Sequence, residues 1–459
     1  MCRAVLVEEV MIKLNINMKK IICIIVLFTG LFATGQVKKW TLEECITYAL
    51  ENNLTIEQLK LQLESIKLGE KDALGAFLPS VNANASGSWS NGRGVDPTTN
   101  TIISGTFFSM SGGLSAGVNL FDGLNNVYRM HRAKLNTLSS QYQVEGIKED
   151  MMLNVANAYL QVLASKESLK AVELQAKITE QDYLKTKELV EAGVVPKGDL
   201  LELEATMANF EQQKVSGMNA VLLNRLFLAQ LLQITDYENF DISDDTYEVP
   251  PSDIFKYSAK EIFAKAMTFR NDMKVSELNV KMAEKDVQIA KGARYPRLGA
   301  SFNYNTRYSG FVKRLAGTPF TTQLSDNDGI GYGLSLNVPI FNGFSVKNNI
   351  SRSKINLRRS ELQFEQDKLG LEANVNQAYL DVRSFAKTYE ASQKTLAARQ
   401  TAYQYAKDRF EVGYMNSFDF SQSQSRMDSA EIDVITAKYN YIFRIKILEL
   451  YFGLPITLD

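Results

Sequence analysis

The sequence is poor in the residues that build catalytic and metal centres. It has one histidine, His131, and three cysteines among 459 residues. A histidine-based metal cluster or catalytic triad cannot be assembled within a chain that has a single histidine. Neither a G-x-x-x-x-G-K-[ST] loop nor a G-x-G-x-x-G fingerprint occurs, so no nucleotide site is evident. We therefore predict no enzyme activity, no catalytic residue, no cofactor and no metal, and we interpret His131 as a solvated helix position.

An excess of charge of one sign is also lacking. The 51 Lys and Arg residues balance 52 Asp and Glu residues, which leaves a net charge of -1. Nucleic-acid binding usually requires a basic surface, so nucleic acid is not an expected partner.

Long apolar runs are confined to the N-terminus. A basic stretch at Met18 is followed by an almost uninterrupted apolar run over 21–33 and by small residues over 33–35. This is the layout of a secretory signal peptide, and a run of about 13 residues is too short to span a bilayer as a helix. We interpret residues 1–35 as a signal peptide, with 1–17 as an upstream extension. The alternative is a buried core helix.

Two consequences follow for the mature chain. Only Cys45 remains after cleavage, so no intrachain disulfide is expected. No later segment is long and apolar enough to span as a helix, so we expect any membrane-embedded part to be a closed barrel.

The chain contains a duplication. Several segments recur at one constant offset of 220 residues: 120–123 as 340–343, 155–160 as 375–380, and 190–193 as 410–413. A constant offset indicates two equivalent structural units. We predict a first repeat at 36–234, an inter-repeat linker or equatorial segment at 235–257, and a second repeat at 258–459.

Each repeat has the pattern helix, strand, strand, long helix, turn, helix. In the first repeat a helix is predicted over 40–76, with Thr41 and Glu44 forming a capping box. A proline-free stretch over 124–192 predicts a helix of about 70 residues, roughly 105 Å long. Its apolar seam follows heptad steps, and a half-length helix is predicted over 199–233. Charged pairs such as Lys166-Glu167 indicate a solvated face or the wall of a lumen.

Four segments alternate with a period of two. They are 81–89, 114–120, 298–304 and 331–338, and the segment between the first two is expected to be a linker. Alternation of apolar with small or polar residues favours strands with one face in lipid and one in water. We predict that 77–121 and 294–341 hold the membrane-embedded surface, and the sequence leaves open which alternate set faces lipid.

These pieces, in this doubled order, resemble the TolC-like outer-membrane efflux protein family, the outer-membrane factors. The resemblance spans 40–454 and is carried by Trp40-Thr41-Leu42, the paired strands, Phe121-Asp122-Gly123 with its counterpart Phe341-Asn342-Gly343, and the two hairpin turns. It implies an α+β membrane protein: a trimeric 12-stranded β-barrel, with four strands per protomer, continued by a long α-helical coiled-coil barrel.

The resemblance also implies a function. The chain would be the outer-membrane exit duct of a tripartite efflux or secretion system, a passive conduit that extends into the periplasm. The implied partners are two further copies in a homotrimer, a periplasmic adaptor (membrane fusion) protein, an inner-membrane transporter and outer-membrane lipid. The alternative is a periplasmic coiled-coil scaffold or adaptor without a pore, which would need neither a signal peptide nor the strands.

Elementary geometry agrees with part of this picture. Four strands cannot close, and an open sheet edge cannot lie in lipid. Eight strands would leave an interior nearly filled by side chains, whereas twelve give a diameter of roughly 24 Å. The number three itself is implied by the resemblance.

The resemblance implies that the adaptor docks at the two hairpin turns. Each turn begins at a glycine that can end a helix in the left-handed conformation. A plain helical-hairpin turn would explain the same pattern. The docking residues expected from the resemblance are Gly193, Val194, Val195, Gly413, Tyr414 and Met415.

A periplasmic aperture is implied at the same end. Asp419 matches a position where the family places an aperture acid, and three copies around an axis would raise one another's pKa. The sequence departs from the family at Gln422, where a second acid is often found. Asp199 and Glu202 have the i, i+3 spacing of one helix face, so they either serve the aperture or cap their helix.

Overall fold

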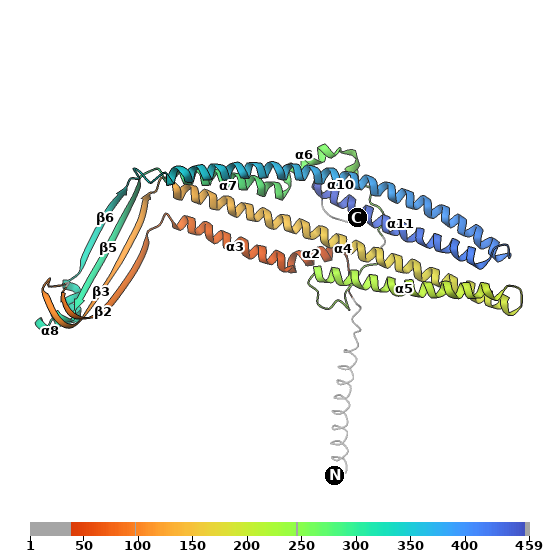
Figure 1. The fold of residues 1–459 in the computed structure, drawn as a ribbon, viewed down its shortest axis with the longest axis horizontal. Helices are drawn as coiled ribbons and strands as arrows, with labels where there is room; N and C mark the ends of the chain where they lie inside the picture. The colour runs from red at the N-terminus through yellow and green to blue at the C-terminus, as the bar shows by residue number, and fades with distance from the viewer. Residues whose placement is uncertain (1–37, 97, 245–246, 455–459) are drawn as a thin grey trace, which may run out of the picture.

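The computed structural model describes residues 38–96, 98–244 and 247–454, so the predicted signal peptide lies outside the described residues. Within the described part of the chain, no helix is long and apolar enough to cross a membrane. The molecule is elongated, with a four-stranded sheet at one end and paired helices over the rest of its length (Figure 1).

Two long helices run the length of the helical part. They are α4 (Asn125–Glu191) and α10 (Ser345–Glu411), and each has 67 residues. Each is accompanied by half-length helices placed end to end: α3 (Leu54–Gly75) and α5 (Lys197–Leu231) beside α4, and α7 (Asn271–Gly292) and α11 (Ser417–Phe452) beside α10. The predicted long helices and the half-length helix predicted over 199–233 are confirmed.

The single helix predicted over 40–76 is wrong, because the chain breaks at Asn53 into α2 (Leu42–Asn52) and α3. The Asn53 side chain accepts hydrogen bonds from the N–H groups of Thr55 and Ile56, so the new helix begins with its first donors satisfied. The second repeat breaks at the equivalent place, between α6 (Ala259–Phe269) and α7. The capping box at the start of α2 is confirmed.

The long helices begin directly after the sheet, through two successive residues in the left-handed conformation. In the first repeat Gly123 has φ 73° and Leu124 has φ 65°. A Cβ at Gly123 would lie 2.2 Å from the carbonyl oxygen of Gly292 at the end of α7, so only glycine fits there. The second repeat makes the same turn at Gly343 and Phe344.

The sheet is antiparallel in the order β2-β3-β5-β6. Its strands are β2 (Ser80–Val95), β3 (Ile102–Phe121), β5 (Arg297–Ser309) and β6 (Gly329–Asn337). The predicted linker between the first two strands is mostly strand. Its serines and glycines resemble a loop in sequence, yet they form the small polar face of a hairpin whose turn begins only at Asp96.

The pairing register decides which side chains share a face. One row across the sheet is Ala83, Leu114, Tyr304 and Ile330, and the adjacent row is Asn82, Ser115, Asn303 and Gly331. One face is therefore apolar and the other small and polar over most of the sheet. Leu334, on the apolar face, is 74 % exposed in the single chain. An exposed apolar face of this kind must be buried against lipid or protein. The apolar face includes Val81, Trp89, Phe108, Val118, Phe302, Tyr332 and Leu336.

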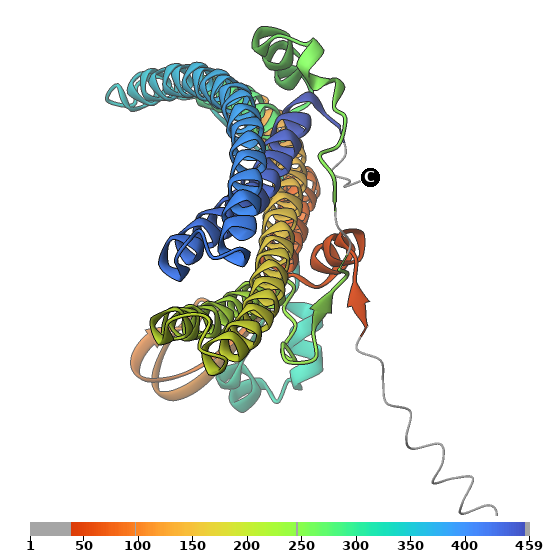
Figure 2. The ribbon, with the colours of Figure 1, turned by 90° about the vertical axis from the view of Figure 1, so that its right-hand side faces the viewer.

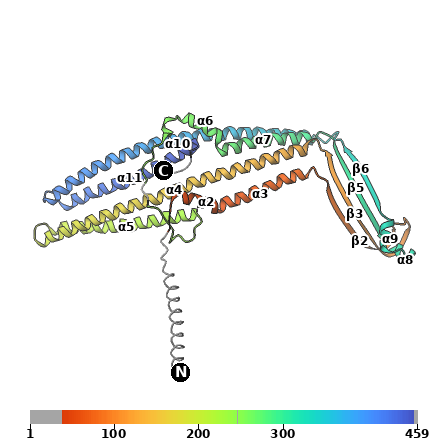
Figure 3. The ribbon, with the colours of Figure 1, turned by 180° about the vertical axis from the view of Figure 1, so that it is seen from behind.

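The loop between β5 and β6 contains two short helices. They are α8 (Gly310–Ala316) and α9 (Phe320–Asp326), and they lie at the end of the sheet farthest from the long helices (Figure 3).

The core lies near the middle of the helical part. Apolar residues of α2, α4, α5 and α11 form one buried cluster there, and α6, α7, α10 and α11 form a second. The two-residue strands β1 (Lys39–Trp40) and β4 (Asp241–Ile242) pair beside the first cluster, so the predicted linker is not featureless. Viewed from the hairpin end, the long helices form a curved layer, with α2 and α6 on one side of it (Figure 2).

Lys166 and Glu167 are half-buried and paired within the chain, so they are not a simple solvated face. The Lys166 ammonium pairs with Asp241 at 2.6 Å and with Asp244 at 2.7 Å, which fastens the inter-repeat segment to α4. The Glu167 carboxylate accepts hydrogen bonds from Lys438 and Tyr439 of α11. These contacts lie far apart in sequence, so a pattern of alternating charge could not reveal them.

Candidate functional site

The two hairpin turns have the same geometry at the end of the molecule opposite the sheet (Figure 1). Gly193 has φ 75° and Gly413 has φ 78°. The residue after each glycine donates its N–H to a carbonyl oxygen five residues earlier, Val194 to Leu189 and Tyr414 to Arg409, at 2.8 Å in both turns. This is the glycine-ended helix terminus that the sequence predicted.

Each turn presents an apolar side chain to solvent. Val194 is 67 % exposed and Tyr414 is 79 % exposed. The next residues, Val195 and Met415, line a cavity of about 190 Å³ between the two turns. The predicted docking residues therefore lie together at one tip, with two of them projecting and two facing inward.

Asp199 joins the two hairpins. Its Oδ1 atom accepts hydrogen bonds from the backbone N–H of Ser417 at 3.2 Å and from the Ser417 hydroxyl at 2.6 Å. Ser417 is the first residue of α11, so Asp199 of α5 caps the neighbouring helix rather than its own, which begins after Pro196. Asp199 thus makes a capping contact, but with a helix of the other repeat and not with its own.

Asp419 lies exposed in the first turn of α11. Its N–H donates to the side chain of Asn416 at 2.8 Å, and its carboxylate accepts from the Asn416 amide at 3.0 Å. A carboxylate is also favoured at a helix N-terminus. Asp419 and Asp199 thus lie at the same tip with different partners.

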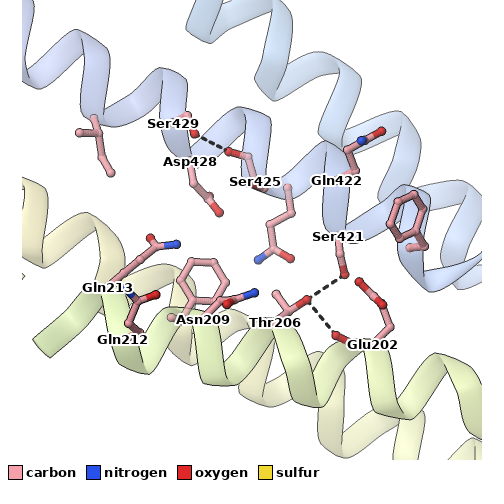
Figure 4. A pocket seen from close by; sticks show the side chains of 14 residues that line it. Glu202, Thr206, Asn209, Gln212, Gln213, Ser421, Gln422, Ser425, Asp428 and Ser429 are labelled. Atoms are coloured by element: carbon pink, nitrogen blue, oxygen red, sulfur yellow. Dashed lines mark hydrogen bonds between the residues drawn. The ribbon is translucent and has the colours of Figure 1, made fainter. Parts of the chain in front are cut away.

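Glu202 and Gln422 line a polar cleft between α5 and α11, with a volume of about 350 Å³ (Figure 4). A hydrogen bond of 3.1 Å between the hydroxyls of Thr206 and Ser421 crosses it. Asp428 lies further along the cleft and points toward α5. The remaining lining is mostly amides and hydroxyls, among them Asn209, Gln213, Gln424, Ser425 and Ser429.

Asp428 is a buried carboxylate in this region. It is only 9 % exposed, and neither carboxylate oxygen has a hydrogen-bond partner among the described residues. Burial, followed by repulsion from Glu431, raises the pKa of Asp428 to about 7. Sequence reasoning missed this residue, although the polar stripe Ser417, Ser421, Gln424 and Asp428 at helical spacing was a usable signal.

Comparison with known proteins identifies the family of the chain. The sequence pattern of the outer membrane efflux protein family matches residues 45–232 and again residues 264–451. The chain belongs to the outer membrane efflux protein family. Both repeats carry the match, in agreement with the duplicated elements of the structure.

Relatives along most of the chain are distant in sequence. Outer membrane efflux protein BepC of Brucella suis is 19 % identical over 432 residues, which cover 92 % of this chain and 88 % of that protein. Outer membrane protein TolC of Vibrio cholerae is 21 % identical and covers 88 % of each. The solved CmeC outer membrane channel of Campylobacter jejuni superimposes with a TM-score of 0.78 at 17 % identity, covering 90 % of this chain and 85 % of that one.

The predicted family, channel fold and outer-membrane location are thereby confirmed. This member of the outer membrane efflux protein family is an exit duct of the outer membrane, and its family is one of channels rather than enzymes. Among the described residues, no group of three or more His, Cys, Asp or Glu side chains is placed to hold a metal ion.

Replacing Asp428 should change the pH dependence of stability. The folded-state pKa of about 7 lies above the usual value for Asp, so stability is full below about pH 4 and is lost as the pH rises through about 7. Asp428→Asn removes the buried charge and should stabilise the fold at pH 8 by about 1–3 kcal/mol, with a smaller effect at pH 5. Thermal unfolding of the purified protein, followed by helical circular dichroism at both pH values, measures this.

The matched control is Asp433→Asn, which removes an exposed carboxylate from the same helix and should leave the profile unchanged. If Asp428→Asn kept the loss of stability between pH 5 and pH 8, Asp428 would not be its source.

Proposed function

We propose that three copies of the chain close into a 12-stranded barrel continued by a helical tunnel, through which solutes leave the cell passively. The observation that carries this proposal is the sheet: one face is apolar, and β2 and β6 stand at its edges. In lipid every backbone donor and acceptor needs a partner, so β6 of one copy pairs with β2 of the next. The small polar face then lines the channel.

The inner wall has little to select a cargo. Its serines, asparagines and glycines are uncharged, and neighbouring hydroxyls bond each other, as Ser86 does with Ser111 at 2.9 Å and Ser88 with Ser109 at 3.1 Å. Such a wall favours water, and its fixed charges within the strands are two arginines of β5, Arg297 and Arg307. Choice of cargo and energy for export therefore come from partner proteins.

Those partners are a periplasmic adaptor and an inner-membrane transporter. A relative from Pseudomonas putida, 24 % identical over 404 residues, is named as the outer membrane protein of a toluene efflux pump. In this chain the exposed Val194 and Tyr414 side chains project at the tip. An adaptor docks there, on Gly193, Val194 and Val195 in one turn and on Gly413, Tyr414 and Met415 in the other.

The same tip forms the periplasmic aperture. Copies of Asp419 around the axis provide a ring of negative charge, with Gln422 one turn further along. The Asp199–Ser417 contact holds the two hairpins of each copy together, and Glu202 faces the cleft that lies between them. Opening requires the hairpins to separate, which breaks the Asp199–Ser417 contact.

The faces of the sheet can be tested with one charge placed on either side. Leu334→Lys puts an ammonium on the apolar face, where a charge in hydrocarbon costs up to about 2–4 kcal/mol. Ser335→Lys puts the same group on the polar face at the same depth and should be tolerated. The yield of the folded, heat-modifiable oligomer in outer-membrane fractions measures both. Equal yields would contradict the assignment of the apolar face to lipid.

The aperture can be tested by single-channel recording in planar bilayers. Asp199→Ala removes two hydrogen bonds that join the hairpins, so the population of open channels should rise by about tenfold. Asp419→Ala should weaken block by divalent cations without a comparable rise. Glu372→Ala, an exposed change in the middle of α10, is the control. Block that persists unchanged in Asp419→Ala would remove this residue from the aperture, and unchanged gating in Asp199→Ala would remove the contact from the gate.

A further inference from the structure

The loop between β5 and β6 folds back onto the apolar face of the sheet. The ring of Phe320 in α9 lies 5.0 Å from that of Tyr308, and the hydroxyl of Thr306 donates to the Leu324 carbonyl at 2.6 Å. Thr306 and Tyr308 belong to the same alternate set of β5 as Phe302 and Tyr304. Helix α9 therefore covers the outer end of the face that we assign to lipid.

The segment is fixed in this position. Gln323 is 1 % exposed, accepts the N–H of Ser309 at 2.9 Å and donates to the Thr318 carbonyl at 3.1 Å. The Ser309 hydroxyl in turn donates to Asp96 in the turn between β2 and β3. At the start of α8, Gly310 packs against the backbone of Phe108, where a Cβ would lie 3.0 Å from the carbonyl oxygen.

A row of aromatic rings connects the sheet to this segment. Trp89 contacts Phe108 at 4.9 Å, Phe108 contacts Tyr308 at 6.2 Å, and Tyr308 contacts Phe320. Beyond Trp89 the alternation reverses, because Asn91 and Arg93 occupy the formerly apolar positions. Aromatic girdles of this kind mark the boundary between the hydrocarbon and the headgroups. The α8–α9 segment thus stands at headgroup level.

The exposed side chains of the segment fit that position. Leu315 is 76 % exposed and Phe320 is 40 % exposed. Lys313 and Arg314 are exposed beside Leu315, and the Arg314 guanidinium lies 5.5 Å from the Phe311 ring. Neither basic residue forms an ion pair with the residues that the structure describes, and the acids Asp326 and Asp328 lie at the other end of the segment.

We propose that α8 and α9, residues 310–326, form a lipid-binding collar that inserts Leu315 and Phe320 into the outer leaflet and binds phosphate-bearing lipid headgroups through Lys313 and Arg314. Long basic side chains can reach headgroups while their stems stay in apolar surroundings. Three collars would anchor the outer rim of the barrel. This inference rests on the proposed function, because it takes the apolar face of the sheet to be in lipid.

Spin labels distinguish this collar from an aqueous loop. In a Cys45→Ala background, Leu315→Cys, Leu334→Cys and Thr101→Cys each carry a nitroxide in vesicles of phosphatidylcholine and phosphatidylglycerol. We expect the label at 315, like that at 334, to collide with oxygen rather than with a water-soluble nickel chelate. The label at Thr101, in the turn between β2 and β3, should behave in the opposite way.

The outcomes separate the two claims. Water exposure at 315 with lipid exposure at 334 overturns the collar and leaves the proposed function intact. Water exposure at both positions overturns the lipid assignment of the sheet itself. A label at 315 that meets neither reagent overturns the collar in favour of a contact between protomers.

Binding of phosphate-bearing headgroups by Lys313 and Arg314 can be measured separately. Native mass spectrometry of the purified oligomer counts bound phosphatidylglycerol against bound phosphatidylcholine. The double variant Lys313→Glu and Arg314→Glu should reduce the preference for phosphatidylglycerol by about tenfold, given the usual contribution of a basic residue at an anionic surface. Lys387→Glu and Lys394→Glu, in the middle of α10, form the control pair. An unchanged preference would overturn the role of the two basic residues.

Discussion

The structure depends on one constraint: a two-faced sheet in lipid cannot leave its edge strands unpaired. Hydrocarbon offers no partner to an exposed backbone N–H or carbonyl group, so the four strands of one chain must continue into those of another. In the proposed barrel, the alternation that places Leu334 outward and Ser335 inward gives a lipid surface and a water-filled interior. The left-handed turns at Gly123 and Gly343 lead directly from the sheet into the long helices, so in the proposed trimer the helices continue the circle of strands as a tunnel.

Packing is uneven along that tunnel. Near the middle, one apolar cluster and the half-buried Glu167–Lys438 pair join the helices of the two repeats, and a second apolar cluster packs the helices of the second repeat together. Toward the hairpin tips the buried contacts between repeats are largely polar, as in the hydrogen bond of 2.8 Å from Gln424 to Thr179. Polar contacts exchange readily with water and contribute about 1 kcal/mol each, whereas an apolar core resists separation. In the proposed duct, this distribution favours movement at the hairpin end, where we place the aperture.

The sequence predicted what is local and repeated. The capping box at Thr41, the bounds of the long helices and the glycine-ended turns depend on neighbouring residues, and duplication gave each a second instance. The sequence-based prediction failed where small polar residues are typical of both loops and strand faces. The serines and glycines after Trp89 were interpreted as a linker, although they form one face of the strands. It could not find Asp199–Ser417, whose partners are 218 residues apart, or the orphaned carboxylate of Asp428, because both depend on how two hairpins meet. Which alternate set forms one apolar face across all four strands became clear only from the strand register.

We propose that the four-stranded sheet closes only by joining three copies. The mass of the intact particle, measured by native mass spectrometry after gentle extraction from the outer membrane, tests this. We expect a particle of three chains whose dissociation coincides with loss of the β-sheet signal. A folded particle of one or two chains that keeps its sheet and conducts ions in a bilayer would contradict it.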